Sequence, residues 1–276
     1  MAALIEPFRQ AFLRDALAEA VLMGVVCGLL GSLVIVRGMT YLGESMSHML
    51  LPGAAIAVAI GLAPDLGGLA AGLVCAALIS WAARRDAIGE DAAIGVVYTG
   101  ALALGVIVLY RNGTPGDLEG LLFGDILAAT TRDVRFAMLV ALLVIVGLAV
   151  GGRGLALTAF DPGFARAAGA RVALLDLGLA AGLAAALAVA LQGVGTLLVL
   201  ALLVAPAAGA RVLARSSGAM LAIAPLLAAL ASVIGIELSY HASLAAGASI
   251  ALAAIGIFLL ALAAARGRSA LQLRHG

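Results

Sequence analysis

Long apolar runs, separated by short breaks that contain charged residues, glycine or proline, constrain the fold of this chain more than any other feature. A helix that crosses the hydrocarbon core of a bilayer needs about 20 mostly apolar residues, because each residue adds only about 1.5 Å of rise. Nine runs satisfy this requirement, and eight spans is the alternative, with one run forming a broken or re-entrant helix. The nine runs are Ala20–Val36, Met46–Leu62, Leu66–Ala83, Ala92–Tyr110, Val134–Val150, Val172–Leu191, Val194–Val212, Ala219–Leu238 and Ala242–Ala264.

Composition agrees with a chain that is surrounded by lipid. Hydrophobic residues occupy 64% of the 276 positions and charged residues only 11%, whereas soluble domains are about half apolar and a quarter charged. The net charge of +1 gives no indication of a nucleic-acid partner, and the sequence contains no G-x-x-x-x-G-K-S/T phosphate loop. We therefore expect an all-α, polytopic transmembrane helix bundle of eight or nine spans. It should hold no permanently bound cofactor, and any ATP hydrolysis should occur on a separate subunit.

The density of charged residues divides the chain into three parts. Residues 1–19 are predicted to form an amphipathic helix in the membrane interface, because charged and apolar side chains alternate there. Residues 20–265 form the predicted transmembrane domain, and residues 266–276 form a polar tail. The charged residues of the first part are Glu6, Arg9, Arg14, Asp15 and Glu19.

The distribution of arginine predicts the orientation of the bundle. If the spans alternate in direction, the arginines after spans three, five and seven and those of the C-terminal tail share one side. The positive-inside rule identifies that side as the cytoplasm. In a bacterial inner membrane, the N-terminus is therefore expected on the extracytoplasmic side and the C-terminus on the cytoplasmic side. Arg111, Arg132 and Arg135 fall on the opposite side, in a loop that also carries four acidic residues. The arginines predicted to be cytoplasmic are Arg84, Arg85, Arg153, Arg166, Arg171, Arg211, Arg215, Arg266, Arg268 and Arg274.

Glu44 and His48 are the first candidates for a metal site. They are four residues apart, so on a helix they lie on the same face. A carboxylate oxygen and an imidazole nitrogen can bind one divalent cation together, and Ser47 adds a hydroxyl oxygen beside that face. The alternative is a hydrogen-bonded Glu–His pair at a helix start, where the helix dipole favours the carboxylate. These ligand types do not distinguish zinc, manganese, iron and cobalt.

Two further positions are weaker metal candidates. Glu237 and His241 have the same spacing, at the predicted outer end of the eighth run. They could receive metal from a donor protein, or they could be a solvated pair in a loop. Asp125, in an apolar outer loop, could touch metal, but its alternative role is a helix cap or a turn.

A short helix is predicted between the fifth and sixth runs. Asp161 is a good N-cap, Pro162 a good first helical residue and Gly169 a good terminator. A tight turn would be enough to connect two spans, so we expect this helix to dock another protein. The predicted docking residues are Asp161, Pro162, Gly163, Phe164, Ala165, Arg166 and Gly169.

Five segments, in order across nearly the whole chain, resemble the permease subunits of zinc/manganese ABC importers. They are Arg37–Gly53, with Leu-Gly-Glu, Ser-His and Leu-Pro-Gly; Leu122–Asp125, which reads Leu-Phe-Gly-Asp; Phe160–Gly169; Gln192–Ala208, with Gly-Val-Gly and Ala-Pro-Ala-Ala; and Ser239–Ala248, with Ser-Tyr and Ala-Gly-Ala.

The resemblance implies a permease like those of type II ABC importers, which carries Zn²⁺ or Mn²⁺ as transported substrate by alternating access. It also implies a second permease chain, in a homodimer or paired with a different permease chain, two ABC ATPase subunits on the cytoplasmic face and an extracytoplasmic metal-binding protein. Phe160–Gly169 then matches the segment that couples to the ATPase. Glu44 and His48 match the in-membrane metal ligands, although the family commonly has aspartate where this chain has Glu44.

Two other functions are compatible with such a sequence. A related importer for a chelated metal, siderophore or cobalamin-like cargo would have a wider channel without side-chain ligands. A secondary metal transporter, driven by an ion gradient, would need no ATPase subunit.

Overall fold

The computed structural model describes residues 11–83, 89–112, 126, 129–193 and 196–272, and throughout these ranges the chain is helical, without a strand. This confirms the predicted all-α fold. The helices are α2 (Ala11–Arg37), α3 (Thr40–Met49), α4 (Leu51–Ala59), α5 (Pro64–Ala82), α6 (Glu90–Asn112), α8 (Thr131–Phe160), α9 (Pro162–Ala167), α10 (Val172–Gly193), α11 (Thr196–Leu213), α12 (Ser217–Ala242) and α13 (Ala246–Gln272).

Seven of the described helices are long and apolar enough to cross a membrane: α2, α5, α6, α8, α10, α12 and α13. The apolar part of α11, Leu198–Leu213, is shorter. The predicted run Met46–Leu62 is not one span, because α3 ends at Met49 and α4 begins at Leu51. Pro52 lies in the first turn of α4, where a proline ring fits, whereas it would clash with a carbonyl group inside a continuous helix. The fold is therefore nearer to the alternative of eight spans with one broken run.

The two predicted domain boundaries do not coincide with helix ends. Residues 11–19 continue into the apolar part of α2 without a break, and α13 runs past residue 266 as far as Gln272. Residues 1–10, the beginning of the predicted interfacial segment, lie outside the described residues.

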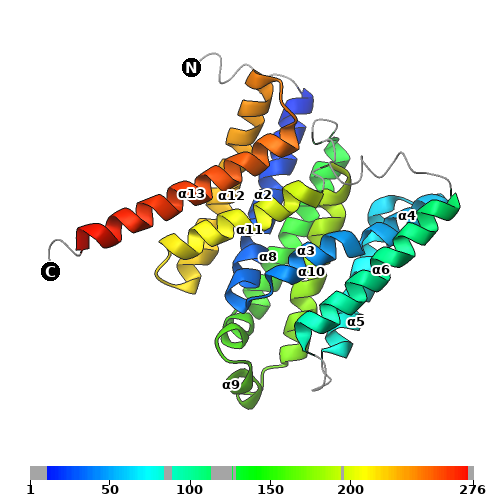
Figure 1. The fold of residues 1–276 in the computed structure, drawn as a ribbon, viewed down its shortest axis with the longest axis horizontal. Helices are drawn as coiled ribbons and strands as arrows, with labels where there is room; N and C mark the ends of the chain where they lie inside the picture. The colour runs from blue at the N-terminus through cyan, green and yellow to red at the C-terminus, as the bar shows by residue number, and fades with distance from the viewer. Residues whose placement is uncertain (1–10, 84–88, 113–125, 127–128, 194–195, 273–276) are drawn as a thin grey trace.

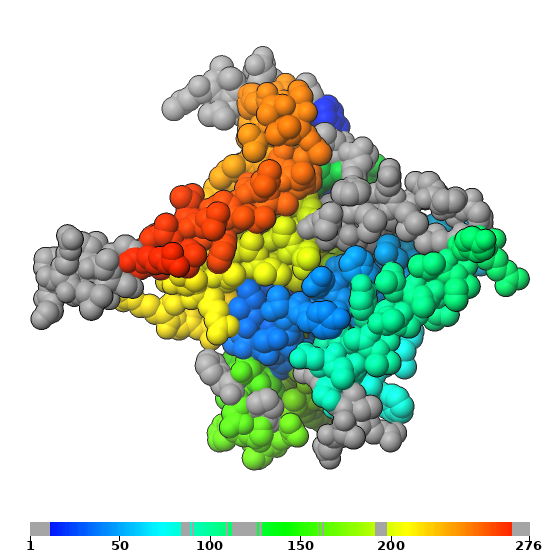
Figure 2. Space-filling model, in the orientation of Figure 1, coloured from blue at the N-terminus to red at the C-terminus, as the bar shows by residue number. Residues whose placement is uncertain are grey.

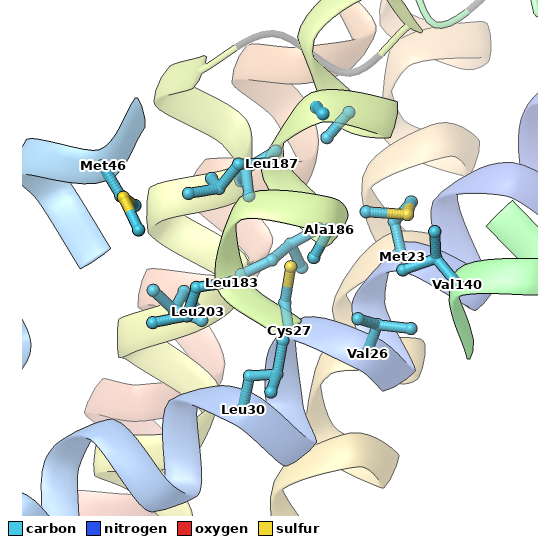
Figure 3. Packing of buried hydrophobic residues seen from close by; sticks show 14 of the residues in the cluster. Met23, Val26, Cys27, Leu30, Met46, Val140, Leu183, Ala186, Leu187 and Leu203 are labelled. Carbon is cyan, nitrogen blue, oxygen red and sulfur yellow. The ribbon is translucent and has the colours of Figure 1, made fainter. Parts of the chain in front are cut away.

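Helix α2 lies at the centre of the bundle and packs against α8, α11 and α12. Small residues allow these close approaches: a Cβ atom at Gly28 would lie 2.7 Å from the Cα atom of Pro225 in α12. Close backbone contact through small residues is how helices associate in lipid, where burial of apolar surface gives no net driving force. On another face of α2, Cys27 points toward Leu183 and Ala186 of α10 (Figure 3). Cys27 and Cys75 are both free and buried.

The remaining helices flank this centre. Figure 1 shows α11, α12 and α13 on one side and α4, α5 and α6 on the other, with α9 projecting from one end of the bundle. We call this end the α9 end. The last residue of α2, Arg37, and the residue after α5, Ala83, line the same cavity as residues of α8 and α10 beside α9. These helices therefore all have one terminus at the α9 end.

Candidate functional site

Helix α3 carries the predicted metal ligands on the open side of the bundle. Gly38 has a φ angle of +73°, which favours glycine, and it turns the chain from α2 into α3. Leu42, Met46 and Met49 face the interior and are 1% exposed or less. The opposite face of α3 is uncovered, and Figure 2 shows this blue region at the surface between α11 (yellow) and α6 (green).

Glu44 lies on the exposed face of α3, and His48 is half-buried one turn further along. The His48 ring contacts the Tyr98 ring of α6, with centroids 5.9 Å apart and ring planes tilted by 51°. Glu44 and His48 form no hydrogen bond or ion pair with each other, nor with any other part of the chain that the structure describes. The alternative role considered for Glu44 and His48, a hydrogen bond between their side chains, is therefore not observed.

Ser47 lies on the interior side of α3. Its side chain is 3% exposed, and its hydroxyl group donates a hydrogen bond to the Gly43 carbonyl oxygen at 3.2 Å. Such bonds to the preceding turn are common for serine in apolar helices. The structure therefore places Ser47 apart from the exposed face that carries Glu44.

The second predicted pair is on a different helix. Glu237 and His241 lie in the last turns of α12, and His241 Nε2 is 3.4 Å from Glu237 Oε2. The His241 side chain is 49% exposed, and its ring meets Tyr240 edge-on. Asp125 lies outside the described residues. Among the residues described, no group of three or more His, Cys, Asp or Glu side chains is placed to hold a metal ion.

The predicted short helix is present as α9. The Asp161 carboxylate accepts hydrogen bonds from the Gly163 and Phe164 amides at 2.8 and 2.9 Å, which caps the helix. Gly169, with a φ angle of +85°, ends it as expected. Helix α9 packs mainly on α8 and α10, and Phe164 is 61% exposed at the end of the bundle (Figure 1). A large exposed aromatic side chain on a projecting, capped helix is suited to docking another protein.

A polar contact between three helices was not predicted from the sequence. The Arg37 guanidinium donates to the Asp176 carboxylate of α10, as an ion pair, and to the Thr158 hydroxyl of α8. A cavity of about 720 Å³ lies beside these groups. Asp176 is the single charged residue of its predicted run, and ionisable groups in spans are costly unless paired. The isolated carboxylate of Asp176 in an apolar run could therefore have indicated an ion pair with another helix.

Glu19 was also missed, because it was assigned to an interfacial segment. It is fully buried, and neither of its carboxylate oxygens has a hydrogen-bond partner in the part of the chain that the structure describes. Asp65, at the start of α5, and Asp133, at the start of α8, are close enough to repel a charge on it. Glu19 thus lies inside the bundle, at the end opposite α9.

The sequence pattern of the ABC 3 transport family matches residues 9–265. The chain belongs to the ABC 3 transport family. The match extends from before α2 into α13, so it covers all the described helices except the end of α13, and every segment on which the resemblance was based. The family predicted from those segments is therefore confirmed.

Proteins from several bacteria match this chain over most of its length. The manganese transport system membrane protein MntC of Halalkalibacterium halodurans is 36% identical over 252 residues, which are 91% of this chain and 86% of that protein. The manganese import system permease protein ScaB of Streptococcus gordonii is 36% identical over 249 residues, 90% of each chain. A solved structure, PsaBC from Streptococcus pneumoniae in complex with Fab, matches with a TM-score of 0.83 and 34% identity over 94% of each chain.

Proposed function

We propose that this chain is the membrane permease of an ATP-driven importer that carries a divalent metal across the bacterial inner membrane. The observation that carries the proposal is the placement of Glu44 and His48, one turn apart on the open face of α3. A carboxylate and an imidazole suit Mn²⁺ and Zn²⁺. Mn²⁺ is the favoured cargo, because the two relatives described above are named for manganese transport.

Two copies of the chain form the transport pathway. Glu44 is exposed on the surface of a single chain, and a carboxylate that faces lipid is costly. A second copy, related by a two-fold axis and packed on the face that carries α3, would cover it. Because such an interface brings the same residues together from both sides, a cation between the chains would meet two carboxylates and two imidazoles. A site of this kind is complete only in the dimer.

The α9 end faces the cytoplasm, and α9 docks on a partner ATPase. Arg166 lies in α9, Arg171 directly precedes α10, and Arg153 lies in the last third of α8. Arg211 donates to the Ile35 carbonyl oxygen near the end of α2. This concentration of arginine supports a cytoplasmic position through the positive-inside rule. The N-terminus is then outside and the C-terminus inside, and an extracytoplasmic binding protein delivers metal at the opposite end.

Transport then follows from alternating access. ATP binding closes the partner ATPases on each other and moves α9, which changes the side from which α3 can be reached. The cation loses part of its hydration shell when Glu44 and His48 bind it. Each chain supplies only two ligands, so the shared set of four is lost when the two chains move apart, and the cation can then be released.

Metal uptake by proteoliposomes that contain the permease and its ATPase tests this function. Glu44→Gln and His48→Ala should abolish ATP-dependent uptake of Mn²⁺ and leave the assembly of the complex unchanged. Glu237→Gln, which alters the other Glu–His pair, is the matched control and should transport. Normal uptake by both Glu44→Gln and His48→Ala would refute the site.

Two comparisons separate the alternative functions. Competition by free Mn²⁺ or Zn²⁺, but not by their chelates, is expected for a pathway with side-chain ligands, and the opposite result would indicate a chelated cargo. Uptake without the ATPase subunit, driven by an ion gradient, would indicate a secondary transporter.

A further inference from the structure

Three helices are joined at Arg37 through charged and polar bonds. Arg37 is the last residue of α2, and its side chain is 4% exposed. One terminal nitrogen donates to Asp176 of α10 and the other to Thr158 of α8. The Thr158 hydroxyl in turn donates to the Leu155 carbonyl oxygen at 3.0 Å, which fixes its orientation. We call this set, Arg37 with Asp176 and Thr158, the Arg37 clamp.

The partners in the Arg37 clamp are the helices that hold α9. Thr158 lies in the last turn of α8, which continues through Asp161 directly into α9. Asp176 lies in the second turn of α10, the helix that follows α9. A displacement of α9 therefore pulls on both partners of Arg37 through the chain itself.

On its other side the Arg37 clamp leads to α3. The chain passes from Arg37 through Gly38 and Met39 into α3, which carries Glu44 and His48. Helix α8 is not among the main packing neighbours of α3, which are α5, α6, α10 and α11. Within the described residues, Arg37 is thus a direct polar link from α8 to the segment that begins α3.

The surroundings give the clamped helices room to move. The cavity of about 720 Å³ is lined by Arg37, Thr158 and Asp176, and by Ile79 and Ser80 of α5. Helix α10 packs along α5, but α8 is not among the main packing neighbours of α5, so the cavity leaves the end of α8 free of α5 and joined to α2 by the Arg37 clamp. The Arg37 side chain is 4% exposed and that of Asp176 is 35% exposed, so removing Asp176 would leave a buried guanidinium charge without its partner.

We infer that the Arg37 clamp transmits movement of α9 to α3, so that ATP hydrolysis on the partner subunit is coupled to exposure of the metal site. Arg37, Asp176 and Thr158 are positioning residues that do not touch the cargo. This inference rests on the proposed function, in which α9 docks on the ATPase and α3 binds the metal.

The test measures metal uptake and ATP hydrolysis in the same proteoliposomes containing the permease and its ATPase. Asp176→Asn keeps the size of the side chain but removes its charge, and Thr158→Val removes the hydroxyl group. We expect Asp176→Asn to lower the Mn²⁺ transported per ATP hydrolysed by about tenfold, as for a typical coupling free energy between sites. Thr158→Val should lower it less, and hydrolysis without Mn²⁺ should be unchanged in both.

A charge exchange and a matched control complete the test. The double variant Arg37→Asp with Asp176→Arg re-forms the ion pair and should recover part of the lost ratio. Arg211→Gln removes another arginine bond to the end of α2, from α11 to the Ile35 carbonyl oxygen, and should leave the ratio unchanged. If the Asp176→Asn permease does not assemble with its ATPase, the ratio of Mn²⁺ transported per ATP in Thr158→Val still tests the inference, because Thr158→Val alters no charge.

The inference is overturned if Asp176→Asn and Thr158→Val transport as much Mn²⁺ per ATP as the unaltered protein. It is equally overturned if uptake and hydrolysis fall in the same proportion, since that is the result of a purely structural role. Equilibrium binding of Mn²⁺ to the same samples separates this outcome from failure of the proposed function. Asp176→Asn should bind Mn²⁺ normally, whereas Glu44→Gln should not, and normal binding by Glu44→Gln would refute the metal site instead.

Discussion

Gly31 of α2 lies directly against the backbone of Leu203 in α11: a Cβ atom at Gly31 would stand 1.9 Å from the Leu203 carbonyl oxygen. No side chain fits in that space unless the two helices separate. The central position of α2 therefore depends on glycine at this point, more than on the many glycines that face open space.

Gly31→Ala is expected to destabilise the protein, because the added methyl group forces α2 away from α11. The loss should be about 1–3 kcal/mol in the free energy of unfolding, as for other overpacked cores. Gly178→Ala is the control, since no neighbouring atom lies within 4 Å of a Cβ atom there. It should be neutral or stabilise the helix by up to about 1 kcal/mol. Thermal unfolding in detergent compares the two, and equal melting temperatures would contradict the close contact.

Glu19→Gln is expected to stabilise the protein. Both carboxylate oxygens of Glu19 are buried without a hydrogen-bond partner among the described residues, and Asp65 and Asp133 disfavour a negative charge there. Glutamine has the same shape and still buries a polar group, but it carries no charge. The free energy of unfolding should therefore rise by about 1–3 kcal/mol, because the repulsion and the cost of burying a charge are removed. Asp15→Asn is the control, because Asp15 accepts a bond from Thr131 and its substitution should not stabilise. A less stable Glu19→Gln protein would show that the carboxylate has a favourable partner.

Phe164→Ala is expected to weaken the association with the ATPase subunit. Phe164 is 61% exposed on α9, and an aromatic anchor in an interface commonly contributes more than 2 kcal/mol, so binding should fall by at least about tenfold. Leu260→Ala removes a side chain that is 71% exposed on α13 and should not affect the association. Co-purification of the ATPase with each variant is the measurement. Full retention by Phe164→Ala would place the docking surface elsewhere.

His241→Ala is expected to have little effect. Glu237 and His241 contact each other, and the histidine is half exposed, so the pair should contribute less than about 1 kcal/mol to stability. Uptake of Mn²⁺ supplied as free ion and Mn²⁺ supplied by the extracytoplasmic binding protein should both be close to normal. A selective loss of uptake from the binding protein would instead assign the pair to metal reception.

Local patterns in the sequence predicted those parts of the fold that are themselves local. Sustained apolar runs identified α8, α12 and α13, and the residues Asp161 and Gly169 marked both ends of α9, because capping depends on a few adjacent residues. The run Met46–Leu62 was predicted as one span because hydropathy averages over many residues and does not register the break before Pro52.

The candidate site was predictable only in part, for a physical reason. The spacing of Glu44 and His48 follows from helix geometry alone, and the structure places them on one helix as expected. The Arg37–Asp176 ion pair joins residues that are 139 positions apart, and no periodicity in the sequence encodes such a partner. The burial of Glu19 likewise depends on α5 and α8, which lie far from it in the chain.

The break between α3 and α4 has a consequence for the route of the ion. The two short helices run from the α9 end, where α2 finishes, to the opposite end, where α5 starts. Helix α3 has 10 residues, or about 15 Å of rise, against a hydrocarbon thickness of about 30 Å. If the proposed function holds, His48, next to the break, would be reached from either face through about half the thickness of the membrane. The barrier to the ion would then be divided into two shorter parts, and the protein would need to hydrate only one of them at a time.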